Sequence, residues 1–581
     1  MNLPKFLKYV DEVLSEMTGE QMTEFVHEIA RTLPERQRNH FIETLKSVRK
    51  NGNTTEDKPD FSMDALELLR RDIAQVTKFL EMVYEGDLRL DSEIDYQYSS
   101  GWSWDEDEYK FRFSDPEDIL PKINKAIKLL HRCIDLEAYH DGAELAGILF
   151  RLTVEVEGDY GDYDGTPLQI DDLFNEELLN GTYDNFVHEA LYLIYNGNKL
   201  ADRPAFLYNF ISGLQYADTK LEDIMQLGDR DLSDFDEFLP LWIAYLGKQN
   251  GSKANDLLDE ALSMAGDDQY LEAARKFSDN HPELYKHILQ NGLADKDDTA
   301  MMKFGMEALE KIREMSTLRG EIALLTADYA NKFTDVETAE RCWLEAFRSD
   351  PSVENYLRIR FFSRDYDRYA VQVKKIYEEC HNKNNHDRSI SCDLSHKQYC
   401  AILFFEKRFE ETMMLGLCEQ NSLGWTYTFM KEGLALFFIL LYRGQYVRPG
   451  IHAMYLNVLS WMSFSAEKLL NGTTFANEPA PEKLFWKSFE SWKSDVDYTA
   501  EDYVHWISIF EDQVSRRVTG IMQASRTKYY EECAAFIAAY GEVLESNGAE
   551  HEKSLIMEKY RAEYPRRRNF ITALRSYGMT R

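Results

Sequence analysis

Continuous helical periodicity is the feature that most constrains this chain. From Pro116 onward, apolar residues return at intervals of three and four, which places them along one face of a helix. One such stripe contains Ile123, Ile127, Leu130 and Cys133. Helix breakers are scarce, with 29 Gly and 14 Pro among 581 residues, and few segments alternate with the period of two that a strand needs. The sequence therefore predicts an all-α chain with at most a minor β element.

Length and linker composition divide the chain into five predicted segments. A chain of 581 residues is roughly four times a domain of about 150 residues. Residues 50–60 have no apolar residue other than a proline and form the clearest linker. We expect an N-terminal helical module over 1–49, this linker, a helical domain over 61–234, helical repeats over 235–445 and a C-terminal helical domain over 446–581.

Residues 85–118 differ from their helical surroundings because they hold twelve acidic and only three basic residues. The alternation in 109–113 can form a short strand, so a small β-hairpin is one alternative here. The favoured interpretation is an acidic insertion with aromatic anchors between two helices. Exposed aromatic side chains beside carboxylates suit a basic segment of a partner protein or peptide. The predicted partner-binding residues are Tyr96, Tyr98, Trp102 and Trp104. The alternative is that both tryptophans pack beneath the insertion as ordinary core.

The segment 338–351 carries a small residue, a large aromatic, a second small residue and a helix-ending proline. These are Ala339, Trp343, Ala346 and Pro351. The segment resembles the second half of a tetratricopeptide repeat, and steps of 34 or 35 residues place apolar residues at the Trp343 and Ala346 positions in four successive units. The resemblance implies an α-solenoid of degenerate helical hairpins over 235–445 whose groove holds a peptide or a partner protein. The alternative is an irregular helical bundle with similar spacing.

The last 31 residues reverse the charge of the chain. The whole sequence has a net charge of −35, whereas residues 551–581 have a net charge of +5. Arginines interleaved with aromatics can bind single-stranded nucleic acid, and in an acidic chain they can also clasp an acidic face of the same protein. The residues of this predicted basic patch are Arg566, Arg567, Arg568 and Arg575.

A cluster of three cysteines and three histidines lies within residues 380–400. Zinc accepts these ligand types, and His396 and Cys400 share a helix face at i, i+4. Together with Cys392 they would be the metal ligands, but the spacing matches no common zinc motif. The favoured interpretation is an inter-helix loop, and we predict no cofactor.

Other sequence features bear on chemistry and compartment. The sequence contains no GxSxG, GxxxxGK[ST] or GxGxxG motif, and we name no catalytic residue. Seven scattered cysteines and an N-terminus without an apolar signal segment predict a cytoplasmic protein. The apolar run 433–442 is about half of the roughly 20 residues that span a bilayer, so it predicts a buried helix and no membrane partner.

These features favour a non-enzymatic scaffold or adaptor that binds a protein or peptide through its helical groove. One alternative is a nucleic-acid-linked regulator, for example in bacterial defence or transcription, that uses the basic patch. A second alternative is a zinc-dependent protein with its site at 380–400.

Overall fold

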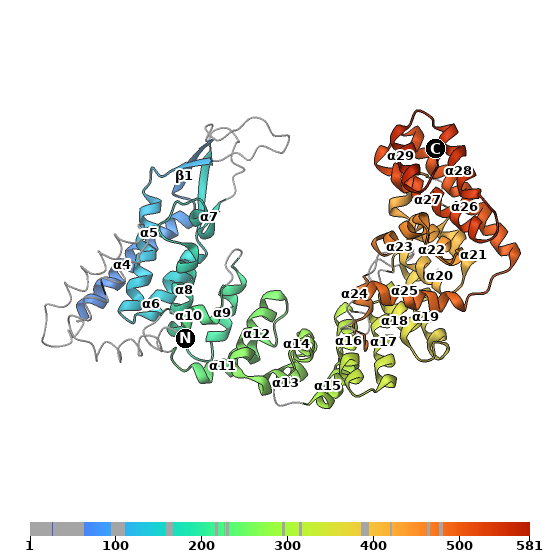
Figure 1. Ribbon diagram of the computed structural model, residues 1–581. Coiled ribbons are helices and arrows are strands. Elements are labelled where there is room, and N and C mark those ends of the chain that lie inside the picture. Colours follow the sequence, from blue (N-terminus) through green and yellow to red (C-terminus); the bar gives the residue numbers. More distant parts are fainter. Residues whose placement is uncertain are drawn as a thin grey trace. The chain divides into compact units, whose positions relative to one another are not determined.

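The computed structural model describes residue 26 and residues 63–94, 111–158, 167–214, 219–225, 227, 232–292, 297–312, 316–384, 394–418, 421–461, 465–475 and 480–580 (Figure 1). Helices form nearly all of the regular structure of these residues, and the strands form one small sheet. The predicted all-α class is confirmed. The chain divides into two compact units, Met1–Ala273 and Ala274–Arg581.

Unit 1 is built around four helices that pack against one another, α4 (Met63–Tyr84), α5 (Ile119–Asp135), α6 (Tyr139–Phe150) and α8 (Tyr183–Gly197). The apolar stripe of α5 faces their shared core, where Ile123, Leu130 and Cys133 are fully buried. Gly142 on α6 allows close packing, because a Cβ there would lie 2.7 Å from a methyl carbon of Leu193. The spacing that predicted the helices thus also predicted the core between them.

A four-stranded sheet lies beside these helices (Figure 1), in the order β2-β1-β3-β4. Strand β1 (Arg89–Ile94) pairs antiparallel with β2 (Phe111–Ser114), so the strand pairing that the sequence offered only as an alternative is present. Strand β1 also pairs in parallel with β3 (Thr153–Gly158), and β3 pairs with β4 (Leu168–Gln169). The sequence analysis did not predict these last two strands.

Further helices complete the described part of unit 1. They are α7 (Ile170–Asn175), α9 (Arg203–Ser212), α10 (Leu221–Met225), α11 (Phe235–Leu246) and α12 (Ser252–Ala265), and α13 (Asp267–Lys276) crosses the boundary between the units.

Unit 2 begins with a succession of antiparallel helices. They are α14 (Glu283–Asn291), α15 (Asp298–Lys311), α16 (Thr317–Lys332), α17 (Val336–Ser349), α18 (Val353–Phe362), α19 (Asp367–Asn384), α20 (His396–Phe405), α21 (Phe409–Gly416) and α22 (Met430–Leu441). Each of these helices from α14 to α18 packs on the next, as do α19 to α22. Contacts also join α14 to α16, α17 to α19, and α18 to α20. Neighbouring hairpins are therefore in contact along this part of the chain.

The C-terminal part of unit 2 holds α23 (Pro449–Trp461), α24 (Ala466–Leu469), α25 (Pro481–Ser494), α26 (Ala500–Gln523), α27 (Tyr530–Ser546), α28 (Glu552–Glu563) and α29 (Arg568–Ser576), with short 3-10 turns η2 (Gly424–Tyr427) and η3 (Thr527–Tyr529). Helix α26 begins with a capping box, since Asp502 N donates to Thr499 Oγ1 at 3.1 Å and Thr499 N donates to Asp502 Oδ2 at 2.8 Å. Helical spacing of apolar residues over 451–470 predicts a single helix, and this prediction is wrong because Ser465 caps a separate helix, α24, through Lys468 N.

The apolar run near residue 440 forms α22, whose side chains are buried apart from the partly exposed Lys431. The expected buried helix is confirmed. Within the part of the chain that the structure describes, no helix combines the length and apolar character needed to cross a membrane.

Candidate functional site

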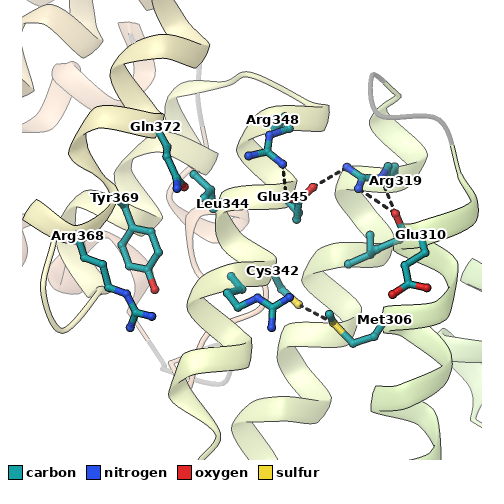
Figure 2. Close-up of a pocket in the computed structure, with 12 residues that line it drawn as sticks. Met306, Glu310, Arg319, Cys342, Leu344, Glu345, Arg348, Arg368, Tyr369 and Gln372 are labelled. Atoms are coloured by element: carbon teal, nitrogen blue, oxygen red, sulfur yellow. Dashed lines mark hydrogen bonds and ion pairs between the residues drawn. The ribbon is translucent and has the colours of Figure 1, made fainter.

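A hollow with a volume of about 440 Å³ lies on unit 2 between α15, α17 and α19 (Figure 2). We call it the arginine hollow, because four of its twelve lining residues are arginines. Its lining residues are Met306, Leu309, Glu310, Arg319, Arg341, Cys342, Leu344, Glu345, Arg348, Arg368, Tyr369 and Gln372. A volume of this size falls in the range of about 300–1,000 Å³ typical of ligand sites.

The two faces of α17 have different roles. On one face Trp343 donates from Nε1 to Gly472 O at 2.6 Å, so a later segment of the same unit covers this side of the helix. Arg358 holds the same segment by donating to the carbonyls of Lys468 and Leu469, at 2.6 and 3.1 Å. The residues of α17 that line the hollow lie on the other side of the helix, so this face stays open to a partner.

One arginine of the hollow is structural. The Arg319 side chain is 7% exposed and donates from Nη2 to Leu309 O at 2.9 Å and from Nη1 to Ser349 Oγ at 2.8 Å. These bonds satisfy the carbonyl of Leu309 in the last turn of α15 and join α15, α16 and α17. Glu345 lies between Arg319 and Arg348 (Figure 2), with ion pairs of 2.8 and 2.5 Å. Arg319 and Glu345 therefore fix the inner wall of the hollow.

Two other arginines keep donors for a ligand. Arg341 is exposed, and within the described residues its side chain makes no hydrogen bond or ion pair. Arg368 is 56% exposed and pairs with Glu337, which is 66% exposed, at 2.8 Å. This hydrogen bond to Glu337 raises the pKa of Arg368. Both guanidinium groups stay charged at neutral pH, and each has the planar fork that binds carboxylates in two-point fashion.

The titratable groups of the hollow favour binding over nucleophilic chemistry. Burial raises the pKa of the Cys342 thiol to about 12, so this side chain is neutral at pH 7 and is a poor nucleophile. Burial, together with the hydrogen bond that Tyr369 donates to Glu340 at 2.9 Å, raises the pKa of Tyr369 to about 12 as well. The hollow thus presents four guanidinium groups and the carboxylates of Glu310 and Glu345, with neutral thiol and phenol groups beside them.

The predicted aromatic site lies outside the described residues. Tyr96, Tyr98, Trp102 and Trp104 all fall between β1 and β2, in a stretch of the sequence that the structure does not describe. Their role stays a prediction from sequence.

The structure describes two of the three predicted zinc ligands, since Cys392 lies outside the described residues. His396 and Cys400 do share one face of α20, with Nε2 and Sγ 3.7 Å apart, and His396 Nε2 also lies 3.0 Å from Leu415 O. Burial raises the pKa of the Cys400 thiol to about 12, whereas zinc binds thiolate. Among the described residues no three His, Cys, Asp or Glu side chains gather as a metal site.

The four arginines of the predicted basic patch have different surroundings. Arg567 turns inward and donates to Met522 O at 2.8 Å and to Ser525 Oγ at 3.1 Å. Arg566, Arg568 and Arg575 are exposed. Arg568 and Arg575 are seven residues apart on α29 and share a face of this helix. Of the four arginines only Arg567 makes such contacts within the described residues, to a carbonyl and a hydroxyl. Elsewhere in the last 31 residues, Lys553 pairs with Glu542 of α27 and Lys559 with Glu511 of α26.

Sequence reasoning missed the arginine hollow, although a signal for it exists. Arg341 and Arg348 are seven residues apart, so a helix places them on one face away from Trp343. The contributions of Arg319 and Arg368 depend on how three hairpins pack, which a periodic pattern does not specify.

A comparison with models of known protein families found no match, and a comparison with curated proteins found none either. The class that can be stated is therefore that of the fold, a helical protein whose unit 2 stacks antiparallel helices. The likeness of Ala339, Trp343, Ala346 and Pro351 to a tetratricopeptide repeat remains a resemblance.

Proposed function

We propose that this protein is a non-enzymatic interaction scaffold of the cytoplasm that binds an acidic peptide segment of a partner protein in the arginine hollow. The observation that carries the proposal is the exposed Arg341 guanidinium, which has no partner in the described part of the chain and lies beside a hollow of about 440 Å³. A carboxylate of a partner would supply the acceptors that Arg341 lacks.

The contacts between neighbouring hairpins support the scaffold interpretation. Helices α15, α17 and α19 contribute one wall segment each, so an extended peptide would cross three successive hairpins. The acidic segment proposed here differs from the basic segment that we expect the acidic insertion to bind. The two expectations concern different sites, the arginine hollow and residues 85–118.

Peptide selection tests the proposal directly. A library of random 12-residue peptides is selected on the full-length protein, and the affinities of enriched peptides are measured by fluorescence anisotropy. We expect enriched peptides to carry Asp or Glu, and the double variant Arg341→Glu/Arg368→Glu to bind them at least tenfold more weakly.

The matched control is Lys483→Glu/Lys487→Glu on α25, which makes the same change in net charge at two exposed lysines outside the hollow. Circular dichroism checks that both variants fold. Equal loss in the two double variants, or enrichment of peptides without acidic residues, would contradict the proposal.

A further inference from the structure

Two turns that are distant in sequence bring five cations together in unit 2. Arg526 and Lys528 lie between α26 and α27, and Arg566, Arg567 and Arg568 lie between α28 and the first turn of α29. We call these five residues the C-terminal basic surface. The hydrogen bonds from Arg567 to Met522 O and Ser525 Oγ hold the two turns together, and the rings of Phe570 and Tyr530 pack 5.8 Å apart beneath them.

The charges of this surface face solvent. Arg526, Lys528, Arg566 and Arg568 are exposed, and none of them forms an ion pair within the described residues. The two cations next to them in the fold are different, because Arg517 and Lys431 both pair with Glu532. The exposed acids closest in sequence are Glu531 and Glu563, so positive charge is in excess here.

Aromatic side chains lie at the edge of the C-terminal basic surface. The Tyr529 ring has Lys528 Nζ and Arg517 Cζ each 4.9 Å from its centroid. Hydrogen bonds with Lys528 and Thr426 lower the pKa of Tyr529, and the bond with Thr426 brings turn η2 to this site. Tyr427, the next residue of that turn, is 89% exposed.

An exposed ring beside unpaired cations is the combination that binds unpaired nucleotides. Arginine and lysine contact phosphates, and a base stacks on an aromatic face whatever its sequence. The net charge of −35 opposes association at long range. Salt screens charges beyond about 8 Å at physiological ionic strength, so the local surface dominates at contact.

We propose that the C-terminal basic surface binds single-stranded nucleic acid, with phosphates on Arg526, Lys528, Arg566 and Arg568 and a base on Tyr427. The arginine hollow is a separate site, so this inference does not depend on the peptide proposal. Arg575 extends the same positive face along α29.

Anisotropy titrations of a labelled 20-nucleotide poly(dT) or poly(U) strand test the proposal in full-length protein. We expect the triple variant Lys528→Ala/Arg566→Ala/Arg568→Ala to bind at least tenfold more weakly and to show a shallower dependence of affinity on salt. Tyr427→Ala removes stacking, so we expect roughly a 5- to 100-fold loss with an unchanged salt dependence.

The control variant Lys128→Ala/Lys483→Ala/Lys487→Ala removes three exposed positive charges elsewhere. It should bind the strand slightly more weakly at most. Absence of binding by the wild type at 50 mM salt would overturn the proposal, as would equal losses in the two triple variants. A poly-glutamate peptide that binds as tightly as the strand, with no effect of Tyr427→Ala, would instead identify the surface as one for acidic polypeptides.

Discussion

Several buried polar side chains hold the helices of unit 2 together. Arg358 is fully buried, and burial lowers its pKa to about 10. Glu432 is also buried and pairs with Lys397 on α20. Removing one residue of a buried ion pair leaves the other charge buried without a partner. The free energy of unfolding then falls by more than the intact pair contributes to it.

Glu432 predicts a measurable pH dependence of stability. Burial raises its pKa from 4.5 to about 7, so between these values the folded state holds more protons than the unfolded state. Stability contributed by the protonated form is present below pH 4.5 and is lost as the pH rises to about 7, by roughly 3 kcal/mol at most.

Thermal melts of wild type and Glu432→Gln across pH 4.5–7.5 measure this effect. We expect the melting temperature of the variant minus that of the wild type to increase as the pH rises through this window. Parallel curves for the two proteins would show that Glu432 is not the titrating group.

Trp343 predicts a stability loss that comes from one hydrogen bond. Trp343→Phe removes the bond from Nε1 to Gly472 O, although Asn331 still donates to this carbonyl at 2.9 Å. We expect a loss of about 1 kcal/mol beyond the cost of the smaller ring.

The matched control is Trp242→Phe on α11, since the buried Nε1 of Trp242 has no hydrogen-bond partner among the described residues. Denaturant unfolding of both variants gives the comparison. An equal loss of stability in the two variants would mean that the Gly472 bond contributes nothing.

At the scale of elements, sequence periodicity predicted where helices form more reliably than where they end. The apolar run 433–442 predicted a buried helix, which the structure places at Met430–Leu441, whereas the stretch 451–470 is interrupted because Ser465 offers its hydroxyl as a cap for a new helix. Strand β3 carries a short alternation in Val154 and Val156, but six residues beside a long helical pattern give a weak signal. Its pairing with β1 depends on the fold of the whole bundle.

Close packing of α15 on α16 depends on Gly305. A Cβ at this position would lie 2.1 Å from Thr326 Oγ1, and Thr326 is fully buried with its hydroxyl donated to Ile322 O. We therefore expect Gly305→Ala to destabilise unit 2 by about 1–3 kcal/mol through overpacking.

Gly147→Ala in α6 is the contrasting substitution, because its Cβ would meet nothing within 4 Å. There the higher helix propensity of alanine should stabilise the protein by about 0.5–1 kcal/mol. Chemical denaturation of both variants measures the difference, and a neutral Gly305→Ala would contradict the close helix contact.

At the scale of the whole molecule, net charge is a poor guide to the local surfaces. The sequence value of −35 predicts repulsion of polyanions, yet the arginine hollow and the C-terminal basic surface both expose unpaired cations. The run Arg566–Arg568 was visible in the sequence, whereas its contact with the turn at Ser525 was not, because 42 residues separate the two partners. For the hollow, the sequence shows only that Arg341 and Arg348 share a helix face, because the other walls come from the packing of neighbouring hairpins.

The most direct test of the central claim is hydrogen–deuterium exchange of the full-length protein with and without a selected acidic peptide. We expect the peptide to slow exchange in α15, α17 and α19 around Arg341, and Arg341→Glu/Arg368→Glu to abolish this protection. Protection confined to other helices, or none at a saturating peptide concentration, would contradict the assignment of the arginine hollow as the binding site.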